Sequence, residues 1–386
     1  MRHKGLNKVD LIFEKVDLRE VLTKAFRMSS EEIIQEILES GLKGRGGAGF
    51  PTGLKWKYTA AEKDPDKYVV CNADEGEPGT FKDREILDKV AGKMYGGMAI
   101  AGHAIGAKKG IVYLRGEYRF LLPQLMRELE SFHAMIAEIG YDFHINYALG
   151  SGAYICGEET SLLNSIEGLR AEVRTRPPFP AVYGLFGKPT VLSNVETFAN
   201  IHYILREGGT KWASMGTEKS PGTKLVSLDG AFNRPGLLEV KMGTPLRSVI
   251  DDLGGGTRYP VKAFQIGGPL GGLVPAWRTD DLTLDFESFA REGFLLGHAG
   301  IVSVPDDFPV IRLIEHLFEF TRKESCGKCF PCRLGSARGH ELVAGAAGEG
   351  EKIDPQLFDD LLEAMELGSL CALGSGLPLP VKNALQ

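Results

Sequence analysis

The stretch Gly41–Trp56 constrains this chain most, because four of the six consecutive residues that begin at position 44 are glycine. A backbone without Cβ atoms can adopt positive φ and approach a ligand closely. Such a loop can turn several N–H groups toward phosphate oxygens, and Arg45 and Lys55 would add positive charge. Phe50 and Trp56 offer flat surfaces on which a heterocycle could stack. The stretch predicts a nucleotide-binding loop, and the alternative is a glycine-rich surface loop without a ligand.

Three glycines of this loop, Gly44, Gly46 and Gly49, also have the spacing of the dinucleotide fingerprint G-x-G-x-x-G. That fingerprint requires a strand directly before the glycines and a helix directly after them. The preceding segment 29–38 predicts a helix instead, because a serine cap and early acidic residues lead into apolar residues at helical spacing. The context is therefore not that of an ordinary Rossmann nucleotide site.

The composition is that of an ordinary globular protein, with 43% hydrophobic and 25% charged residues in a chain of 386. This length suggests two or three domains. A net charge of -6, without a basic stripe that carries aromatic residues, argues against nucleic acid as the main partner. The longest apolar run, Tyr95–Ala107, is well short of the roughly 18 residues that a membrane span needs. We expect a cytoplasmic protein without direct membrane contact, which would reach the cytoplasmic face of a membrane only through partner subunits.

An acidic loop follows the first predicted strand. Residues 67–72 have the apolar character of a buried strand, and Asp74, Glu75 and Glu77 lie just beyond it. Ligands of α/β folds bind outside the carboxyl ends of strands, so carboxylates in this place suggest a binding role. Their partners could be ribose or ribityl hydroxyls, a nicotinamide carboxamide or a cation. The alternatives are a solvated acidic turn and, less favoured, a divalent-metal site.

Strands and helices alternate through the first half of the chain. The predicted strands are 67–72, 110–115 and 142–147, and the predicted helices are 83–107, 120–139 and 195–207. This alternation predicts a mostly parallel sheet covered by helices on both faces. A second glycine loop, 150–164, follows the third strand and carries Tyr154, Glu158 and Glu159 near the start of a helix. Cys156 in this loop has no evident histidine partner, and we interpret it as a small buried side chain.

Two further segments could serve the same pocket, the basic–aromatic turn 174–180 and the polar segment 192–197. Two separate glycine loops suit one extended nucleotide-like ligand, or two ligands stacked against each other.

The composition changes to a Gly/Ser/Thr linker near 208–222. The elements predicted after it are a hairpin of strands 224–228 and 236–240, a helix 246–253 and a strand 263–266. That order is β-grasp-like. Three later segments show apolar residues at helical spacing, 308–321, 334–347 and 355–367. We therefore expect three domains, at 1–215, 222–305 and 306–386.

Four of the six cysteines lie in the last sixth of the chain: Cys326, Cys329, Cys332 and Cys371. Three thiolates at intervals of three wrap one face of a compact cluster and a remote fourth completes the set, which is the arrangement of a [4Fe–4S] cluster. A four-cysteine zinc site usually has two separated C-x-x-C pairs, so zinc is the less favoured alternative and free thiols are the least. Lys328 and Arg333 would lower the negative charge around the sulfurs and raise the reduction potential.

A nucleotide-sized pocket and an iron–sulfur cluster in one chain indicate redox chemistry. A cluster carries one electron at a time, whereas a nicotinamide releases a hydride, which carries two. A flavin can accept the pair and release the electrons singly, so a dinucleotide stacked over a flavin mononucleotide would account for two glycine loops. Hydride transfer needs mainly positioning and no dedicated acid–base residue.

These features together resemble the NADH-binding flavoprotein subunit of respiratory complex I and the similar diaphorase subunits of NAD-linked hydrogenases and formate dehydrogenases. The resemblance covers nearly the whole chain. It is carried by the four cysteines and by the segments 41–56, 71–87, 150–164, 176–180 and 193–197. It implies an α/β fold with a Rossmann-like FMN- and NADH-binding domain, a small β-grasp-like domain and a C-terminal helical bundle that carries the iron–sulfur cluster.

The resemblance also implies a set of cofactor-binding residues. Those implied for FMN are Gly44, Arg45, Gly46, Gly47, Lys55, Asn72, Asp74, Tyr154, Gly157, Glu158, Asn194 and Thr197, and Glu75 is a further cofactor-binding candidate. Those implied for NADH are Phe50, Tyr58 and Phe179 around the adenine, Arg176, and the catalytic candidates Glu77 and Glu159 near its polar parts. Tyr58 stands where phenylalanine is expected and Arg176 where lysine is common, and both exchanges keep the chemistry.

The implied function is electron input. Hydride would pass from NADH to FMN, and single electrons would pass to the [4Fe–4S] cluster and on to partner subunits. These partners would be a [2Fe–2S] thioredoxin-like subunit and further iron–sulfur subunits of a complex I-type NADH:quinone oxidoreductase. One alternative is the diaphorase subunit of an NAD-reducing or bifurcating hydrogenase or formate dehydrogenase. The alternative of another class is a non-enzymatic iron–sulfur scaffold that binds a nucleotide. Glu77 would disfavour NADPH by repelling its extra phosphate.

Overall fold

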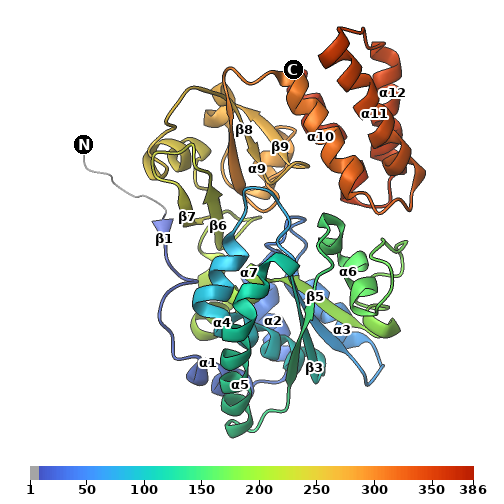
Figure 1. The fold of residues 1–386 in the computed structure, drawn as a ribbon. Coiled ribbons are helices and arrows are strands. Elements are labelled where there is room, and N and C mark those ends of the chain that lie inside the picture. The colour runs from blue at the N-terminus through green and yellow to red at the C-terminus, as the bar shows by residue number, and fades with distance from the viewer. Residues whose placement is uncertain (1–7) are drawn as a thin grey trace.

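The computed structural model describes residues 8–386, within which the strands form two sheets and the last part of the chain is helical. Figure 1 shows the parallel sheet and its helices in the lower half of the view, with the second sheet above and the C-terminal helices at the upper right. An α/β portion, a β-grasp-like portion and a helical portion thus follow one another along the chain. The fold class expected from the sequence is confirmed.

Helices of the first portion surround the lower sheet. They are α1 (Leu18–Ala25), α2 (Ser30–Ser40), α3 (Thr52–Ala61), α4 (Lys82–Ile105), α5 (Leu122–Glu138), α6 (Glu159–Ile166), α7 (Val195–Glu207) and α8 (Gly209–Ala213), with 3-10 turns at Gly116–Leu121, Tyr154–Gly157 and Leu185–Gly187. The helix predicted over 29–38 is α2, which Ser29 and Glu32 begin with a reciprocal capping box. The helix that was predicted to begin at position 120 instead begins as a 3-10 turn and becomes α5 at Leu122.

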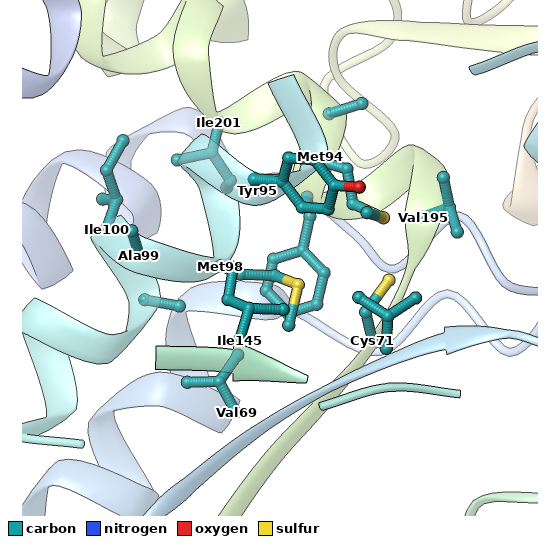
Figure 2. Packing of buried hydrophobic residues seen from close by; sticks show 14 of the residues in the cluster. Val69, Cys71, Met94, Tyr95, Met98, Ala99, Ile100, Ile145, Val195 and Ile201 are labelled. Atoms are coloured by element: carbon teal, nitrogen blue, oxygen red, sulfur yellow. The ribbon is translucent and has the colours of Figure 1, made fainter. Parts of the chain in front are cut away.

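The lower sheet is wholly parallel, with the order β4-β3-β2-β5 among the described residues. Its strands are β2 (Tyr68–Ala73), β3 (Lys109–Leu114), β4 (His144–Leu149) and β5 (Thr190–Asn194). Val69 and Cys71 of β2 face the core that α4, α5 and α7 cover, whereas Val70 faces the core under α6. Figure 2 shows Val69 and Cys71 packed with Met98 of α4 and Val195 of α7. Both faces are covered, and the carboxyl ends of all four strands meet along one edge.

The second sheet has the order β1-β7-β6-β10-β8-β9 within residues 8–386. Its elements are β1 (Lys8–Val9), β6 (Thr223–Leu228), β7 (Gly236–Lys241), a π-helical turn (Ser248–Leu253), β8 (Val261–Ile266), β9 (Gly272–Pro275), a 3-10 turn (Ala276–Asp281), α9 (Phe286–Arg291) and β10 (Gly300–Pro305). The predicted hairpin and third strand are confirmed, and the helix predicted over 246–253 is the π-helical turn. β6 and β10 pair in parallel at the centre, and the other described pairs are antiparallel.

The sequence did not predict β1. A two-residue strand is too short to show an alternating pattern, and β1 joins the second sheet by pairing with β7. The Glu239 carboxylate on β7 accepts the N–H groups of Leu11 and Ile12 at 2.7 and 2.9 Å. Lys93 of α4 donates to the Ile12 carbonyl at 2.8 Å. The N-terminal segment therefore connects the first portion to the second.

The C-terminal portion packs around a core of its own, which includes Phe318, Val343 and Leu362. Its helices are α10 (Val310–Glu324), α11 (Phe330–Glu349), α12 (Pro355–Gly368), α13 (Ala372–Ser375) and α14 (Pro378–Ala384). The three helices predicted here correspond to α10, α11 and α12. In the described part of the chain, no helix combines the length and the apolar character that crossing a membrane requires.

The crossing of α4 and α7 depends on Gly97. A Cβ atom at this position would lie 2.1 Å from the carbonyl oxygen of Phe198. Because the backbone of α7 would have to move, we expect Gly97→Ala to destabilise the fold by about 1–3 kcal/mol in thermal or denaturant unfolding. The matched control is Gly92→Ala in the same helix, where the new Cβ would meet Leu18 at an ordinary 3.5 Å. Helix propensity should make that change neutral or stabilising, and equal losses in both variants would contradict the prediction.

Candidate functional site

The site lies where the carboxyl ends of the parallel strands meet. The Asn72 side-chain amide donates to the Gly157 carbonyl at 2.8 Å, which holds the acidic loop after β2 against the second glycine loop after β4. A Cβ on Gly157 would lie 3.2 Å from the Asp74 carbonyl oxygen, and one on Gly150 would lie 3.2 Å from Asp74 Oδ1. The two glycines therefore permit the close contact of these loops. The structure thus brings together two loops that the sequence analysis identified separately.

The first glycine loop connects α2 to α3. The Gly44 N–H donates to the Phe50 carbonyl at 2.8 Å, which closes the loop. Gly47 has a φ of +132°, which side chains other than glycine rarely adopt. A Cβ on Gly46 would lie 3.0 Å from Cβ of Asn194, at the start of α7. The loop thus approaches α7 with backbone atoms and no side chain, and backbone N–H groups in such a loop can bind a phosphate.

Arg45 does not face the space above this loop. Its guanidinium is fully buried and donates to the carbonyl oxygens of Pro221, Thr223 and Lys43 at 2.8, 2.9 and 3.0 Å. Its backbone N–H donates to the Thr197 hydroxyl at 2.8 Å. The positive charge that the sequence analysis assigned to a phosphate therefore points into the protein, where it anchors the loop to the second sheet. Thr197 holds the same loop from α7.

A buried network of charges lies beside the glycine loop. Lys82 Nζ donates to Asp83 at 2.7 Å and to the side-chain oxygen of Asn194 at 3.0 Å. The Glu196 carboxylate lies 3.1 Å from Lys82 and also accepts from Lys224 of β6. Burial alone would lower the pKa of Lys82, but Asp83 and Glu196 outweigh burial and raise the pKa, so this lysine stays charged.

Sequence reasoning missed Lys82 and Lys224. A lysine in the first turn of a helix or in a strand usually reaches solvent, and no local pattern shows which carboxylate it will meet. Lys82 has one weak signal, since it follows the acidic loop within the segment that carries the family resemblance.

Two of the predicted acidic ligands cap helices. Glu75 accepts the N–H groups of Asp83 and Arg84 in the first turn of α4, at 2.9 and 3.1 Å. Glu158 accepts two N–H groups in the first turn of α6, both at 2.9 Å. The first N–H groups of a helix have no acceptor within the helix, and these carboxylates supply one. In this structure they fix the acidic loop and the second glycine loop to the helices that follow.

Asp74 and Glu77 instead each keep a buried oxygen without a partner. Asp74 Oδ2 and Glu77 Oε2 have no hydrogen-bond donor among residues 8–386, while the other carboxylate oxygen of Glu77 accepts from the Tyr154 hydroxyl. Burial is the main cause that raises the pKa of both carboxyls to about 7. Buried acceptors without donors are expected where a ligand supplies them. These two residues therefore fit hydroxyl or N–H groups of a flavin or a nicotinamide.

Basic and aromatic side chains lie beside the two glycine loops. The exposed aromatic residues are Phe50, Tyr58 and Phe179, at 47%, 52% and 56% exposure. Lys55 Nζ lies 5.9 Å from the Phe50 ring centroid and 3.7 Å from Glu159 Oε2. Glu159 also pairs with Arg176 at 2.7 Å. This group of charges joins the first glycine loop, the second glycine loop and the basic–aromatic turn.

The four predicted cluster ligands lie together in the C-terminal portion. They are Cys326, in the turn after α10, Cys329 and Cys332 at the start of α11, and Cys371 at the start of α13. Cys332 and Cys371 are buried in one core, and Cys326 and Cys329 pack against it. Burial is the main cause that raises the pKa of Cys332 to about 11 and of Cys371 to about 12, and the charges of neighbouring thiols, with that of Glu158 for Cys371, add to the rise. Within residues 8–386, no three His, Cys, Asp or Glu side chains are gathered as ligands of one metal ion. A [4Fe–4S] cluster is a larger body than one ion, and its irons supply the positive charge that thiolates need.

The raised pKa of Glu77 predicts a stability that depends on pH. A carboxyl whose pKa rises on folding stabilises the fold below its unfolded value of 4.5, and this contribution is lost as the pH rises through about 7. We expect Glu77→Gln, which removes the buried charge, to raise the thermal midpoint of the ligand-free protein at pH 8 and to raise it much less at pH 5, where the gain is about 1 kcal/mol or less. The gain at pH 8 would be roughly 3 kcal/mol. Glu363→Gln at an exposed position should change neither midpoint, and a gain for Glu77→Gln that is equal at both pH values would refute the assignment.

Two family models match the chain in the regions that hold these groups. The model described as "Nuo51 FMN-binding domain" matches residues 37–203, which include both glycine loops and the acidic loop. The model described as "NADH-ubiquinone oxidoreductase-F iron-sulfur binding region" matches residues 312–386, which include the four cysteines.

Relatives with similar sequences and structures extend over nearly the whole chain. The NADP-reducing hydrogenase subunit HndC of Solidesulfovibrio fructosivorans is 40% identical over 100% of this chain and 80% of its own length. The mitochondrial NADH-ubiquinone oxidoreductase 51 kDa subunit of Neurospora crassa is 38% identical over 92% of this chain and 75% of its own length. In the crystal structure of an NAD+-reducing [NiFe]-hydrogenase in the H2-reduced state, a chain 35% identical to this one superposes with a TM-score of 0.91. That match covers 99% of this chain and 66% of the hydrogenase chain. The chain therefore belongs to the family of FMN- and iron–sulfur-binding NADH oxidoreductase subunits that includes the 51 kDa subunit of NADH-ubiquinone oxidoreductase and the diaphorase subunits of hydrogenases.

Proposed function

We propose that this chain is the electron-input subunit of a complex I-type NADH:quinone oxidoreductase, which takes hydride from NADH and delivers single electrons to partner subunits. One observation carries the proposal. Two buried carboxylate oxygens that have no partner among residues 8–386 lie beside the second glycine loop, and Tyr154 of that loop contacts the cysteine portion. The pocket for a nucleotide and the ligands for a cluster are therefore adjacent. The FMN and iron–sulfur family models match these same two regions and support the proposal.

The first glycine loop is assigned to the FMN phosphate. The donors proposed for it are the N–H groups of Gly46 and Gly47 and the Lys55 ammonium, which donates to the Leu192 carbonyl at 2.9 Å and has further N–H bonds to offer. The Gly44 N–H and the Arg45 guanidinium are bound to carbonyl oxygens of the protein. Asn72 and Asp74, at the carboxyl end of β2, are assigned to the ribityl hydroxyls, and the unpaired oxygen of Asp74 is the acceptor. Bound FMN supplies the exchange between a two-electron donor and a one-electron cluster.

The remaining side chains position NADH. Phe50, Tyr58 and Phe179 provide exposed rings on which adenine can stack. Glu77 accepts from a polar group of NADH through the oxygen that has no donor among residues 8–386, and Glu159, which is paired with Arg176, accepts from a further polar group of the dinucleotide. These residues orient the reacting rings and exclude water, which is the main demand of hydride transfer.

The cluster and its partners complete the proposal. The four cysteines hold a [4Fe–4S] cluster, from which electrons leave to a [2Fe–2S] thioredoxin-like subunit and further iron–sulfur subunits. The protein works in the cytoplasm and reaches the membrane through these partners. The three main cores, each formed chiefly by one portion, support a division into domains at 1–215, 222–305 and 306–386, although residues such as Ile155 and Leu270 join the core of the cysteine portion.

A second candidate is the diaphorase subunit of an NAD-reducing or bifurcating hydrogenase or formate dehydrogenase. The structural likeness to an NAD+-reducing [NiFe]-hydrogenase, with a TM-score of 0.91, specifically favours it. The same site can run in either direction, because the potentials of the partners set the direction of electron flow. The candidate of another class is a non-enzymatic scaffold that binds a nucleotide. It would use the unpaired oxygens of Asp74 and Glu77 in the same way, and it differs from the first two candidates in predicting no reduction by NADH.

An anaerobic absorbance spectrum of the purified protein tests the chemistry. We expect flavin bands over a broad iron–sulfur absorbance, and we expect one equivalent of NADH to bleach the flavin bands because the proposed function has NADH donate hydride to the flavin. Iron and sulfide analysis of the same sample serves as the control for cluster loading. A spectrum with both cofactors that NADH leaves unchanged would favour the scaffold, and a colourless zinc protein would rule out electron transfer.

Glu77 is proposed to select NADH over NADPH. Its carboxylate repels the additional phosphate of NADPH, so Glu77→Gln should reduce the ratio of kcat/KM for NADH to that for NADPH by roughly tenfold, about 1.4 kcal/mol. The ratio is measured with an artificial electron acceptor at one ionic strength. Glu75→Gln is the matched control, because Glu75 lies in the same loop but faces α4. An unchanged ratio in Glu77→Gln would remove this role from Glu77.

A further inference from the structure

The second glycine loop is packed into the cysteine portion. Ile155 is buried in the core that contains the cluster cysteines, and Tyr154 packs against the same core. The Tyr154 ring meets the Phe320 ring of α10 edge to face, with centroids 5.0 Å apart and planes at 73°. Two residues of a loop assigned to the nucleotide pocket, Tyr154 and Ile155, therefore have hydrophobic contacts in the neighbouring portion.

Glu324 forms the polar part of this contact. It is the last residue of α10 and precedes Cys326 by two positions. Its Oε2 accepts the backbone N–H of Tyr154 at 2.9 Å. Tyr154 begins a 3-10 turn with no capping side chain of its own, so its N–H needs an acceptor from elsewhere. Glu324 supplies that acceptor from the cysteine portion.

The same tyrosine also contacts the nucleotide pocket. Its hydroxyl donates to one carboxylate oxygen of Glu77, and the other oxygen of Glu77 is the one without a partner among residues 8–386. The backbone of Tyr154 is thus held by Glu324, and its side chain holds Glu77. A displacement of the Tyr154 backbone would move its hydroxyl and with it the Glu77 carboxylate, whose unpaired oxygen is the acceptor proposed for NADH.

Independent contacts fix the cysteine turn against the segment after α6. The Arg170 guanidinium donates to the Cys326 carbonyl at 2.9 Å. Lys328 pairs with Glu172 at 3.0 Å. These two contacts hold the turn after Glu324, and the Tyr154 N–H holds the Glu324 carboxylate itself. Together they fix the position of Glu324 relative to the second glycine loop.

We propose that Glu324 is a positioning residue for the nucleotide pocket, which acts through Tyr154 on Glu77. The inference rests on the proposed function, since it assigns the Glu77 carboxylate to NADH. It makes the cysteine portion part of the nucleotide site as well as the holder of the cluster. The essential property of Glu324 is a hydrogen-bond acceptor at the correct reach, and its charge is not required.

The test compares variants of Glu324 in the holoprotein. Two quantities are measured: the dissociation constant of NAD+ on the oxidised protein, from the flavin difference spectrum, and KM and kcat for NADH with an artificial acceptor. Glu324→Ala removes the acceptor and should raise the NAD+ dissociation constant and the KM at least tenfold, while kcat at saturating NADH changes less than threefold. Glu324→Gln retains an acceptor of the same length and should stay within twofold of the wild type.

Controls separate positioning from general damage. Glu319→Ala removes a carboxylate of the same helix that pairs with Lys323 at the surface, and it should leave every measured quantity within twofold. Iron content is measured in every variant. Glu324→Asp keeps the charge beside the cysteine turn but withdraws the acceptor by one methylene, so it should raise the NAD+ dissociation constant at least threefold. This variant decides the question if Glu324→Ala loses iron or does not fold.

The outcomes are distinct. An NAD+ dissociation constant within twofold of the wild type in an iron-replete Glu324→Ala or Glu324→Asp variant overturns the positioning role. A Glu324→Gln variant as impaired as Glu324→Ala also overturns it, because the charge would then be the important property. A wild-type protein that neither binds NAD+ nor oxidises NADH refutes the proposed function itself.

Discussion

The architecture of the site depends on the buried pairing of Glu196 with two lysines, Lys82 and Lys224. Glu196 stands at the start of α7, Lys82 at the start of α4 and Lys224 on β6, so one carboxylate joins two helices of the first portion to the second sheet. Burial alone would raise the pKa of Glu196, but the two lysines outweigh burial and lower it. Removing one partner would leave an uncompensated buried charge, which costs several kcal/mol. Asn194, held by Lys82, and the glycine loop above it rely on this pairing.

The carboxylates of the site form two groups, of which one caps helices and the other keeps an acceptor oxygen for a ligand. Glu75 and Glu158 satisfy the first N–H groups of α4 and α6, which gives the two loops a fixed direction. Asp74 and Glu77 are buried with an oxygen unpaired among the described residues, which destabilises the ligand-free fold and leaves an acceptor for a ligand. The first group therefore fixes the loops of the site, and the second group provides hydrogen-bond acceptors for a ligand.

Much of the fold could be predicted because its signals are local. Apolar periodicity located three strands of the parallel sheet, β2, β3 and β4, and the long helices to within a few residues, and the capping box marked the start of α2. The fourth strand, β5, was not predicted as a strand, since its segment was interpreted only as polar. β4 begins at His144, two residues later than predicted, because the buried Phe143 just before it continues the apolar pattern of a strand. β1 escaped prediction because its pairing with β7 joins residues more than two hundred positions apart.

The sequence by itself determined the chemistry: the cysteine spacing indicated an iron–sulfur cluster, and the glycine and acidic loops indicated a nucleotide pocket. Those signals are short-range, since a few neighbouring residues supply each one. Only the tertiary structure decided the role of each charged side chain. Arg45, Glu75 and Glu158 resemble ligands in the sequence, yet each is bound to protein groups, because the fold places carbonyl oxygens or helix N–H groups within their reach. A charged side chain interacts with whatever partner lies closest in space, and sequence distance does not determine that partner.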